Sequence, residues 1–101
     1  MYLVQLLLPF YDNAGRRVPH EKFAQVRDEL TERYGGVTAY LRSPAQGTWK
    51  DGGAVERDEI VMCEVMVASL DRKWWSAYRK ALEERFDQQE LVVRASALER
   101  L

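Results

Sequence analysis

The sequence has one cysteine, Cys63, and one histidine, His20, among its 101 residues. A single cysteine cannot form an internal disulfide, and metal sites built from several thiolates are excluded with it. A single histidine likewise excludes the common metal sites in which two or three imidazoles share one ion. We therefore expect neither a bound metal nor a cofactor.

Two further features are missing, a long apolar run and an excess of charge of one sign. No stretch approaches the roughly 18 apolar residues of a membrane-spanning helix. The apolar residues 1–10 lack the basic start and the small-residue cleavage site of a signal peptide. The 15 basic and 16 acidic residues give a net charge of −1 at pH 7, which is not typical of nucleic-acid binders. We expect a cytoplasmic protein that binds neither nucleic acid nor a membrane.

The composition is that of a globular protein, with 47% hydrophobic and 31% charged residues. A chain of this length is long enough to bury one hydrophobic core and too short for two. The sequence contains no internal repeat, linker or low-complexity tract. We expect residues 1–101 to form a single domain.

Hydrophobic periodicity divides the chain into six elements. It predicts strands over residues 2–8, 37–43, 58–68 and 91–95, and helices over residues 19–34 and 71–87. The order β-α-β-β-α-β, with right-handed crossovers and antiparallel hairpin pairing, predicts an α+β ferredoxin-like sandwich. The expected sheet has four antiparallel strands in the order 4-1-3-2, with both helices on one face.

Turn and cap signals support these boundaries. Pro19 suits a first helical residue, and Gly35 suits the left-handed conformation that ends a helix. Asp71 suits the N-cap of the second helix, with Leu70 and Trp75 placed to form a hydrophobic staple. Asp51-Gly52-Gly53 predicts a hairpin turn, whose flanks at 47–50 and 54–57 could pair.

Five short motifs, spread over most of the chain, resemble one family of small, uncharacterised bacterial proteins of about this length. The motifs are Tyr34-Gly-Gly-Val-Thr38, Gly47-Thr-Trp49, Asp58-Glu59, Glu64-Val-Met-Val67 and Phe86-Asp-Gln-Gln-Glu90. They are turns, strands and caps. The resemblance implies a ferredoxin-like fold and contributes no catalytic residue, because no activity is established for the family.

Alternation along the strands assigns side chains to the two faces of the predicted sheet. The continuous apolar sets should face the helices: Tyr2, Val4, Leu6, Leu8, Val61, Cys63, Val65 and Val67. The opposite, uncovered face should carry Leu3, Gln5, Leu7, Thr38, Tyr40, Arg42, Ile60, Met62, Glu64, Met66, Val92, Arg94 and Ser96. We expect Leu3, Leu7, Ile60, Met62 and Met66 to form a contiguous exposed patch, which is typical of an interface or a ligand groove.

The candidate ligand-binding residues are polar or aromatic side chains on this face or near it. They are Gln5, Tyr40, Arg42, Trp49, Glu64 and Arg94. Glu64 lies on a central strand among apolar neighbours, where an isolated carboxylate is costly to bury and an arginine could neutralise it. Trp49, beside Gly47 and Gly52, is either an aromatic lid over a pocket or a packing residue of its hairpin.

Two interpretations of the uncovered face stay open. In the first, two copies of the chain pack sheet to sheet as a homodimer, with the charged groups as structural pairs. In the second, the face also holds a small-molecule pocket in which Glu64 acts as acid or base. A cofactor-free enzyme of the dimeric α+β barrel type, similar to monooxygenases or isomerases, is the alternative to a binding or interaction domain. It requires a pocket lined by Tyr40, Glu64 and an arginine, between the helix layer and the sheet or between subunits.

Other functions of this topology are disfavoured. An RNA-recognition motif stacks bases on aromatic side chains of its two central strands, and those positions hold no aromatic residue here. His20, beside Glu21 at the start of a helix, could act as a base, although a histidine there is usually only a surface residue.

Overall fold

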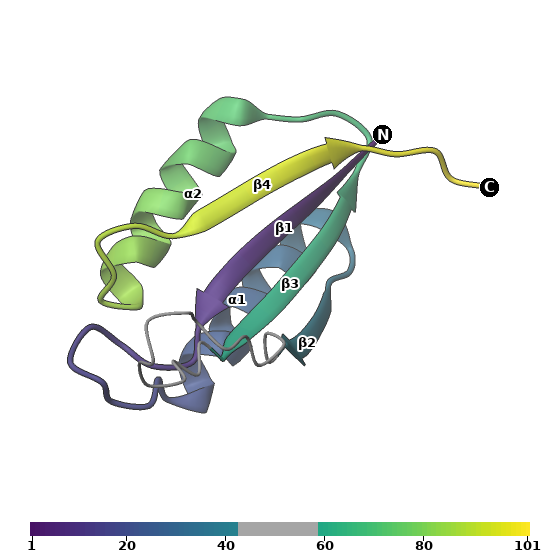
Figure 1. Cartoon of the computed structure of the whole chain (residues 1–101). Coiled ribbons are helices and arrows are strands. Elements are labelled where there is room, and N and C mark those ends of the chain that lie inside the picture. The colour runs from purple at the N-terminus through teal and green to yellow at the C-terminus, as the bar shows by residue number, and fades with distance from the viewer. Residues whose placement is uncertain (43–58) are drawn as a thin grey trace, which may run out of the picture.

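The structure is a computed structural model that describes residues 1–42 and 59–101. Its elements are β1 (Tyr2–Pro9), α1 (His20–Tyr34), β2 (Thr38–Arg42), β3 (Ile60–Val67), α2 (Arg72–Arg85) and β4 (Val92–Ala97). Both helices lie on the same side of one sheet (Figure 1). The expected hairpin at 51–53, with its flanks, lies outside the described residues.

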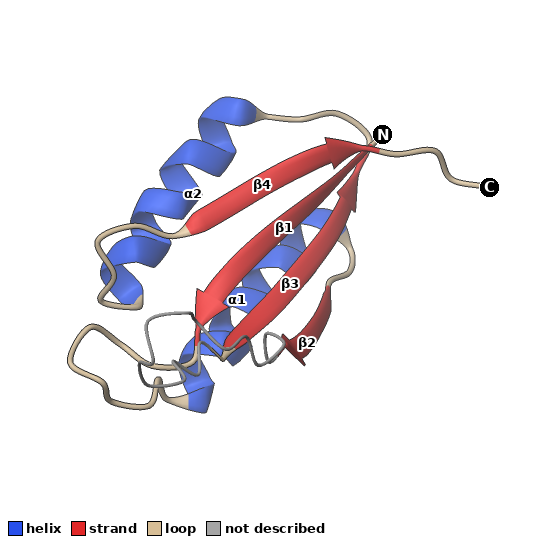
Figure 2. Cartoon of the chain, viewed as in Figure 1, coloured by secondary structure: helices blue, strands red, loops and turns tan. Residues whose placement is uncertain are grey.

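The four strands form one antiparallel sheet in the order β2-β3-β1-β4 (Figure 2). This is the predicted order, so the α+β ferredoxin-like layout is confirmed. In the centre of the sheet, Gln5 pairs with Glu64 on one side and with Arg94 on the other. Three residues far apart in the sequence therefore share one row across three strands.

The side of the sheet that faces the helices holds the hydrophobic core, as alternation predicts. Its strand residues include Val4, Leu6 and Leu8 of β1 and Cys63, Val65 and Val67 of β3, all of them buried. The helices contribute Val26, Leu30, Trp75 and Leu82, and the segment after α2 contributes Phe86 and Leu91. No polar or charged residue of the described chain is buried.

The ends of the two helices agree with the predicted capping residues, except that α1 begins one residue later than predicted. Gly35 has φ 81°, a left-handed conformation, and its backbone N–H donates to the Thr31 carbonyl at the end of α1. At the start of α2, the Trp74 backbone N–H donates to the Asp71 carboxylate over 3.1 Å. Pro19 is the N-cap of α1 and not its first helical residue, because its ψ of 142° is extended.

The two helices meet through an aromatic cluster made by Tyr34, Trp74, Trp75 and Tyr78. The rings of Tyr34 and Trp75 stack at 5.4 Å and 6°, while Trp74 meets Trp75 edge-on at 4.7 Å. Trp75 is buried and Trp74 only half-buried, as their 100° separation on a helix predicts. The guanidinium of Arg33 lies 4.0 Å from the Trp74 ring centroid and caps the cluster.

A polar network continues the same helix–helix interface toward the end of α2. Arg85 donates two hydrogen bonds to Glu29, of 2.6 and 3.0 Å, and the Tyr78 hydroxyl donates to the same carboxylate over 3.0 Å. The hydrogen bonds from Arg85 lower the pKa of Glu29, against the opposing effect of burial. Burial and the bond to Glu29 raise the pKa of Tyr78. These groups fill each other's hydrogen-bonding capacity, so we assign them to helix packing.

Candidate functional site

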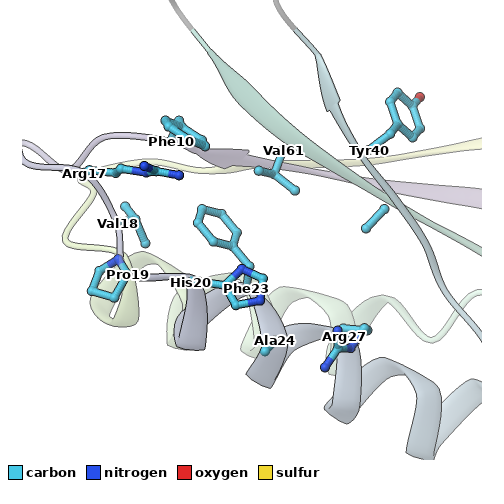
Figure 3. Close-up of a pocket in the computed structure, with 11 residues that line it drawn as sticks. Phe10, Arg17, Val18, Pro19, His20, Phe23, Ala24, Arg27, Tyr40 and Val61 are labelled. Carbon is cyan, nitrogen blue, oxygen red and sulfur yellow. The ribbon is translucent and has the colours of Figure 1, made fainter.

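A hollow lies between α1 and the β2–β3 edge of the sheet, on the helix side where the enzyme alternative allowed a pocket. It is an open cavity of about 670 Å³ (Figure 3). Its lining comes from the β1–α1 connection, the first half of α1, β2 and β3: Phe10, Arg17, Val18, Pro19, His20, Phe23, Ala24, Arg27, Ala39, Tyr40 and Val61. The volume lies within the range of small-molecule sites in proteins.

The β1–α1 connection is held in place by a compact turn. Both Ala14 and Arg16 donate their backbone N–H to the Asp12 carboxylate, over 2.9 Å each. Gly15 has φ 77°, which a residue with a side chain adopts only with strain. The Val18 N–H donates to the Phe10 carbonyl over 2.9 Å, which returns the chain toward the sheet. The turn therefore brings Arg17 and Val18 back beside Phe10.

Aromatic rings form one end of the cavity. Phe23 of α1 packs on Phe10 at a centroid distance of 6.5 Å and on the core residue Phe86 at 5.3 Å. In Figure 3 the ring of Phe23 points from the helix toward Val61 on the sheet. This chain of rings connects the cavity wall to the core, so the wall is preformed.

The charged side chains among the described lining residues are all arginines. The Arg17 guanidinium lies 4.7 Å from the centroid of Phe10, and Arg27 lies further along α1 (Figure 3). None of the lining residues in the described chain is acidic. Arg27 contacts Asp28 at 3.3 Å, but both side chains are more than half exposed, so this pair neutralises little. The cavity thus combines apolar walls with positive charge.

The predicted residues of the uncovered face form a separate arrangement. Gln5 donates from Nε2 to Glu64 Oε2 over 2.7 Å, and Arg94 donates from Nε to Gln5 Oε1 over 2.9 Å. The structure therefore brings Gln5, Glu64 and Arg94 together in a hydrogen-bonded row, which we call the polar row. In the row, Glu64 and Arg94 are linked through Gln5 and do not contact each other directly.

The remaining predicted residues lie in different places, some at the cavity and some away from it or outside the described residues. Tyr40 lines the rim of the cavity, and its ring points away from the helix in Figure 3. His20, weighed as a base, also lines the cavity. Arg42 is the last residue of β2 and pairs with Ile60 in the ladder, and its side chain is not described. Trp49 lies outside the described residues.

The expectation of a continuous exposed patch on the uncovered face was partly wrong. Met66 is 56% exposed and Val92 is 48% exposed, and Leu3, Leu7 and Ile60 are half-buried. Met62, however, has no exposed surface. Its neighbours in the two adjacent ladders are the large residues Leu7 and Tyr40, which flank it on both sides.

The chain matches no protein-family model and no curated protein sequence. The family resemblance of the five motifs therefore stays a prediction. In residues 1–42 and 59–101, no helix is long and apolar enough to cross a membrane. The same residues contain no cluster of three or more His, Cys, Asp or Glu that could hold a metal ion.

Of the described residues that line the cavity, only Tyr40 and His20 had been weighed as functional from the sequence. Arg17 and Arg27 stand in charged, exposed stretches, ten positions apart in the sequence. Alternation assigns side chains to the two faces of a sheet and carries no information about the connection before α1. One signal was present: Phe10 and Phe23 are aromatic residues on either side of that connection, where solvent exposure of both would be costly.

Proposed function

We propose that this domain binds a small organic anion with an apolar body in the cavity between α1 and the sheet. The observation that supports this is the composition of the lining, in which the described residues join aromatic and aliphatic walls to two arginines and include no acidic residue. Arginine recognises carboxylates and similar oxyanions through paired N–H donors. The apolar walls would bind the body of the ligand, and Arg17 and Arg27 its charged group.

The position of Glu64 favours a ligand-binding function over an enzymatic one. Glu64, the predicted acid or base, lies in the polar row on the uncovered face, whereas the cavity is on the helix side. The cavity lining does include His20 and Tyr40, which can transfer protons. An enzyme alternative in this cavity would use His20, and not Glu64 or Tyr40, because Glu64 lies on the uncovered face and the ring of Tyr40 points away from the helix (Figure 3).

A probe of this chemistry tests the proposal directly. We expect 2-naphthoate to bind by calorimetry and to raise the melting temperature, because it has a flat apolar body and one carboxylate. The uncharged 2-naphthamide, of nearly the same shape, should bind about three- to tenfold more weakly, since it lacks the charge that an arginine recognises. Equal affinities for the two probes, or no binding of either, would contradict the proposal.

Arginine-to-glutamine variants inside and outside the cavity test whether naphthoate binds there. Arg17→Gln and Arg27→Gln should each weaken naphthoate binding about three- to tenfold. Arg16→Gln removes the same charge from an exposed neighbour that does not line the cavity, and should change the affinity less than about twofold. A similar loss in all three variants would indicate a general charge effect and no specific site.

We also propose that the uncovered face packs against a second copy of the chain. The exposed Met66 and Val92, next to the half-buried Leu3 and Leu7 on either side of the polar row, support this, because exposed apolar surface is typical of interfaces. Light scattering at micromolar concentration should give twice the chain mass of 11.8 kDa. A mass of one chain under those conditions would contradict it.

A further inference from the structure

We infer that the second copy packs with its twofold axis parallel to β1, so that Glu64 of each copy faces Arg94 of the other. The inference rests on the proposed homodimer and specifies its geometry. It is drawn from the polar row and from the positions of three strands, β3, β1 and β4, which carry Glu64, Gln5 and Arg94 in that order across the sheet.

The polar row has opposite charges on its two sides. Glu64 lies one strand to one side of Gln5, and Arg94 lies one strand to the other side. Neighbouring strands are about 4.8 Å apart, so the two charged residues are separated by about 10 Å at the backbone. The face is therefore neutral in its described part but polarised across the strand direction.

The symmetry of a homodimer, together with these charges, favours one direction of the twofold axis between the two sheet faces. Two identical faces meet about a twofold axis that lies between them. An axis along β1 exchanges the β3 side with the β4 side, and so places each Glu64 opposite an Arg94. An axis perpendicular to the strands through Gln5 would place each Glu64 opposite the other Glu64, and each Arg94 opposite the other Arg94. Like charges that lose water against each other are strongly unfavourable, which excludes that orientation.

The hydrogen bonds within each chain leave donors of Arg94 and an acceptor of Glu64 available for an ion pair between the two copies. In the polar row, Gln5 uses only the Nε donor of Arg94 and only the Oε2 acceptor of Glu64. The two Nη groups of Arg94 and the Oε1 atom of Glu64 have no side-chain partner among the described residues. The intrachain bonds orient both side chains before association, which reduces the entropy that association costs.

The rows on either side are compatible with this axis. On one side Leu3 lies between Met66 and Ser96, and on the other Leu7 lies between Met62 and Val92. The same rotation brings Leu3 against Leu3, Leu7 against Leu7 and Met66 opposite Ser96, and it places Val92 over Met62, which has no exposed surface of its own. Strands of eight, five, eight and six residues, at about 3.3 Å per residue and about 4.8 Å apart, give a face of about 430 Å² in plan. That plan area is below the roughly 800 Å² per partner of a standard specific interface, so we expect a small interface.

Charge reversal tests the orientation. Glu64→Arg places arginine opposite Arg94 under this geometry, and Arg94→Glu places glutamate opposite Glu64. Each should weaken the dimer by about tenfold or more in sedimentation equilibrium. The double variant Glu64→Arg/Arg94→Glu restores opposite charges across the axis and should recover most of the affinity. Lys73→Glu, an exposed change on α2, should leave the dimer unchanged.

The outcomes separate the orientation from the dimer itself. A wild-type chain that stays monomeric overturns the proposed homodimer and this geometry with it. A wild-type dimer that tolerates both single reversals, or whose double variant is weaker than either single one, overturns the geometry and leaves the dimer. Circular dichroism and thermal melts of each variant show whether the fold is retained, so that loss of the dimer is not confused with unfolding.

Discussion

The two faces of this sheet are built from alternate residues of the same strands, and they differ in kind. The helix side carries aliphatic side chains that are almost fully buried, with no charge among them. The opposite side carries the polar row of Gln5, Glu64 and Arg94 between apolar neighbours. The first face is complete within one chain, whereas the second has charged groups whose hydrogen-bonding capacity is only partly used.

The contrast suggests that stability and recognition are assigned to different faces. Burial of apolar area on the helix side supplies most of the favourable free energy of folding. The partly exposed polar row adds little to that free energy, since paired charges near the surface contribute about 0–1 kcal/mol. Changes on the two faces should therefore have effects of very different size.

The largest difference is expected in the reactivity of thiols on the two faces of β3. Cys63 faces the helices, is buried, and has its pKa raised by burial to about 11. Its reaction with a disulfide reagent requires the folded chain to open, which should slow it by about a thousandfold or more relative to the unfolded protein.

A cysteine on the opposite face provides the control. In the variant Cys63→Ala/Met66→Cys the thiol occupies an exposed position three residues along the same strand. It should react within about tenfold of the unfolded rate when the protein is dilute enough to be monomeric. Fast labelling of native Cys63 would contradict the closed core on the helix side.

Two adjacent leucines of β1 provide the next comparison. Leu6 has no exposed surface and faces the helices, while Leu7 is half-buried on the other side. Leu6→Ala should lower the free energy of unfolding by about 2–5 kcal/mol, because it leaves a cavity in the core. Leu7→Ala should lower it by less than about 1.5 kcal/mol in the monomer. Urea denaturation of the two variants measures both values, and equal losses would contradict the assignment of faces.

The sequence was sufficient to predict the fold because its local signals agree with one another. Alternation at Val4, Leu6 and Leu8, the glycine cap at Gly35 and the N-cap at Asp71 all indicated the same elements. The polar row was also within reach, since strand order and parity place Gln5 between Glu64 and Arg94. The hydrogen bonds of the row were not predicted: the sequence suggested a direct arginine partner for Glu64, whereas in the described residues Gln5 lies between Glu64 and Arg94. The role of these residues as a ligand site stays a prediction.

The cavity could not be predicted in the same way. Alternation says which side of a strand faces the helices, but not how closely a helix approaches it. Near Ala39, on the edge strand β2, a small side chain leaves room that Phe23 and Val61 do not fill. Such a gap depends on the tilt of α1 against the sheet, which no residue pattern specifies.

In the helix layer, the carboxylate of Glu29 has its hydrogen-bonding partners within the same chain, so its contribution to stability can be tested in the monomer. Glu29 accepts hydrogen bonds from Arg85 and Tyr78, and its pKa lies below the ordinary 4.5. A lowered carboxyl pKa stabilises the fold above the ordinary value, and this contribution disappears as the pH falls through the lowered pKa. At neutral pH Glu29→Gln should cost about 0.5–1.5 kcal/mol, a moderate value because the pair is partly exposed.

The pH dependence distinguishes this pair from a general loss of packing. The difference in free energy of unfolding between wild type and Glu29→Gln should shrink in acid, where both side chains are uncharged. Glu32→Gln, an exposed change on the same helix, should show little difference at any pH. A difference for Glu29→Gln that stays constant into acid would assign the loss to shape and not to charge.

The smallest effect is expected for Glu64→Gln in the monomer. A glutamine at this position can still accept the hydrogen bond that Gln5 donates over 2.7 Å, and the link from Gln5 to Arg94 is retained. The free energy of unfolding should therefore change by less than about 1 kcal/mol in dilute solution. At concentrations where the dimer forms, the same variant leaves Arg94 of the partner copy opposite an uncharged group, and its dissociation constant should rise by about three- to tenfold. A stability loss in the monomer as large as that in the dimer would show that Glu64 serves the fold of one chain and not the contact between two.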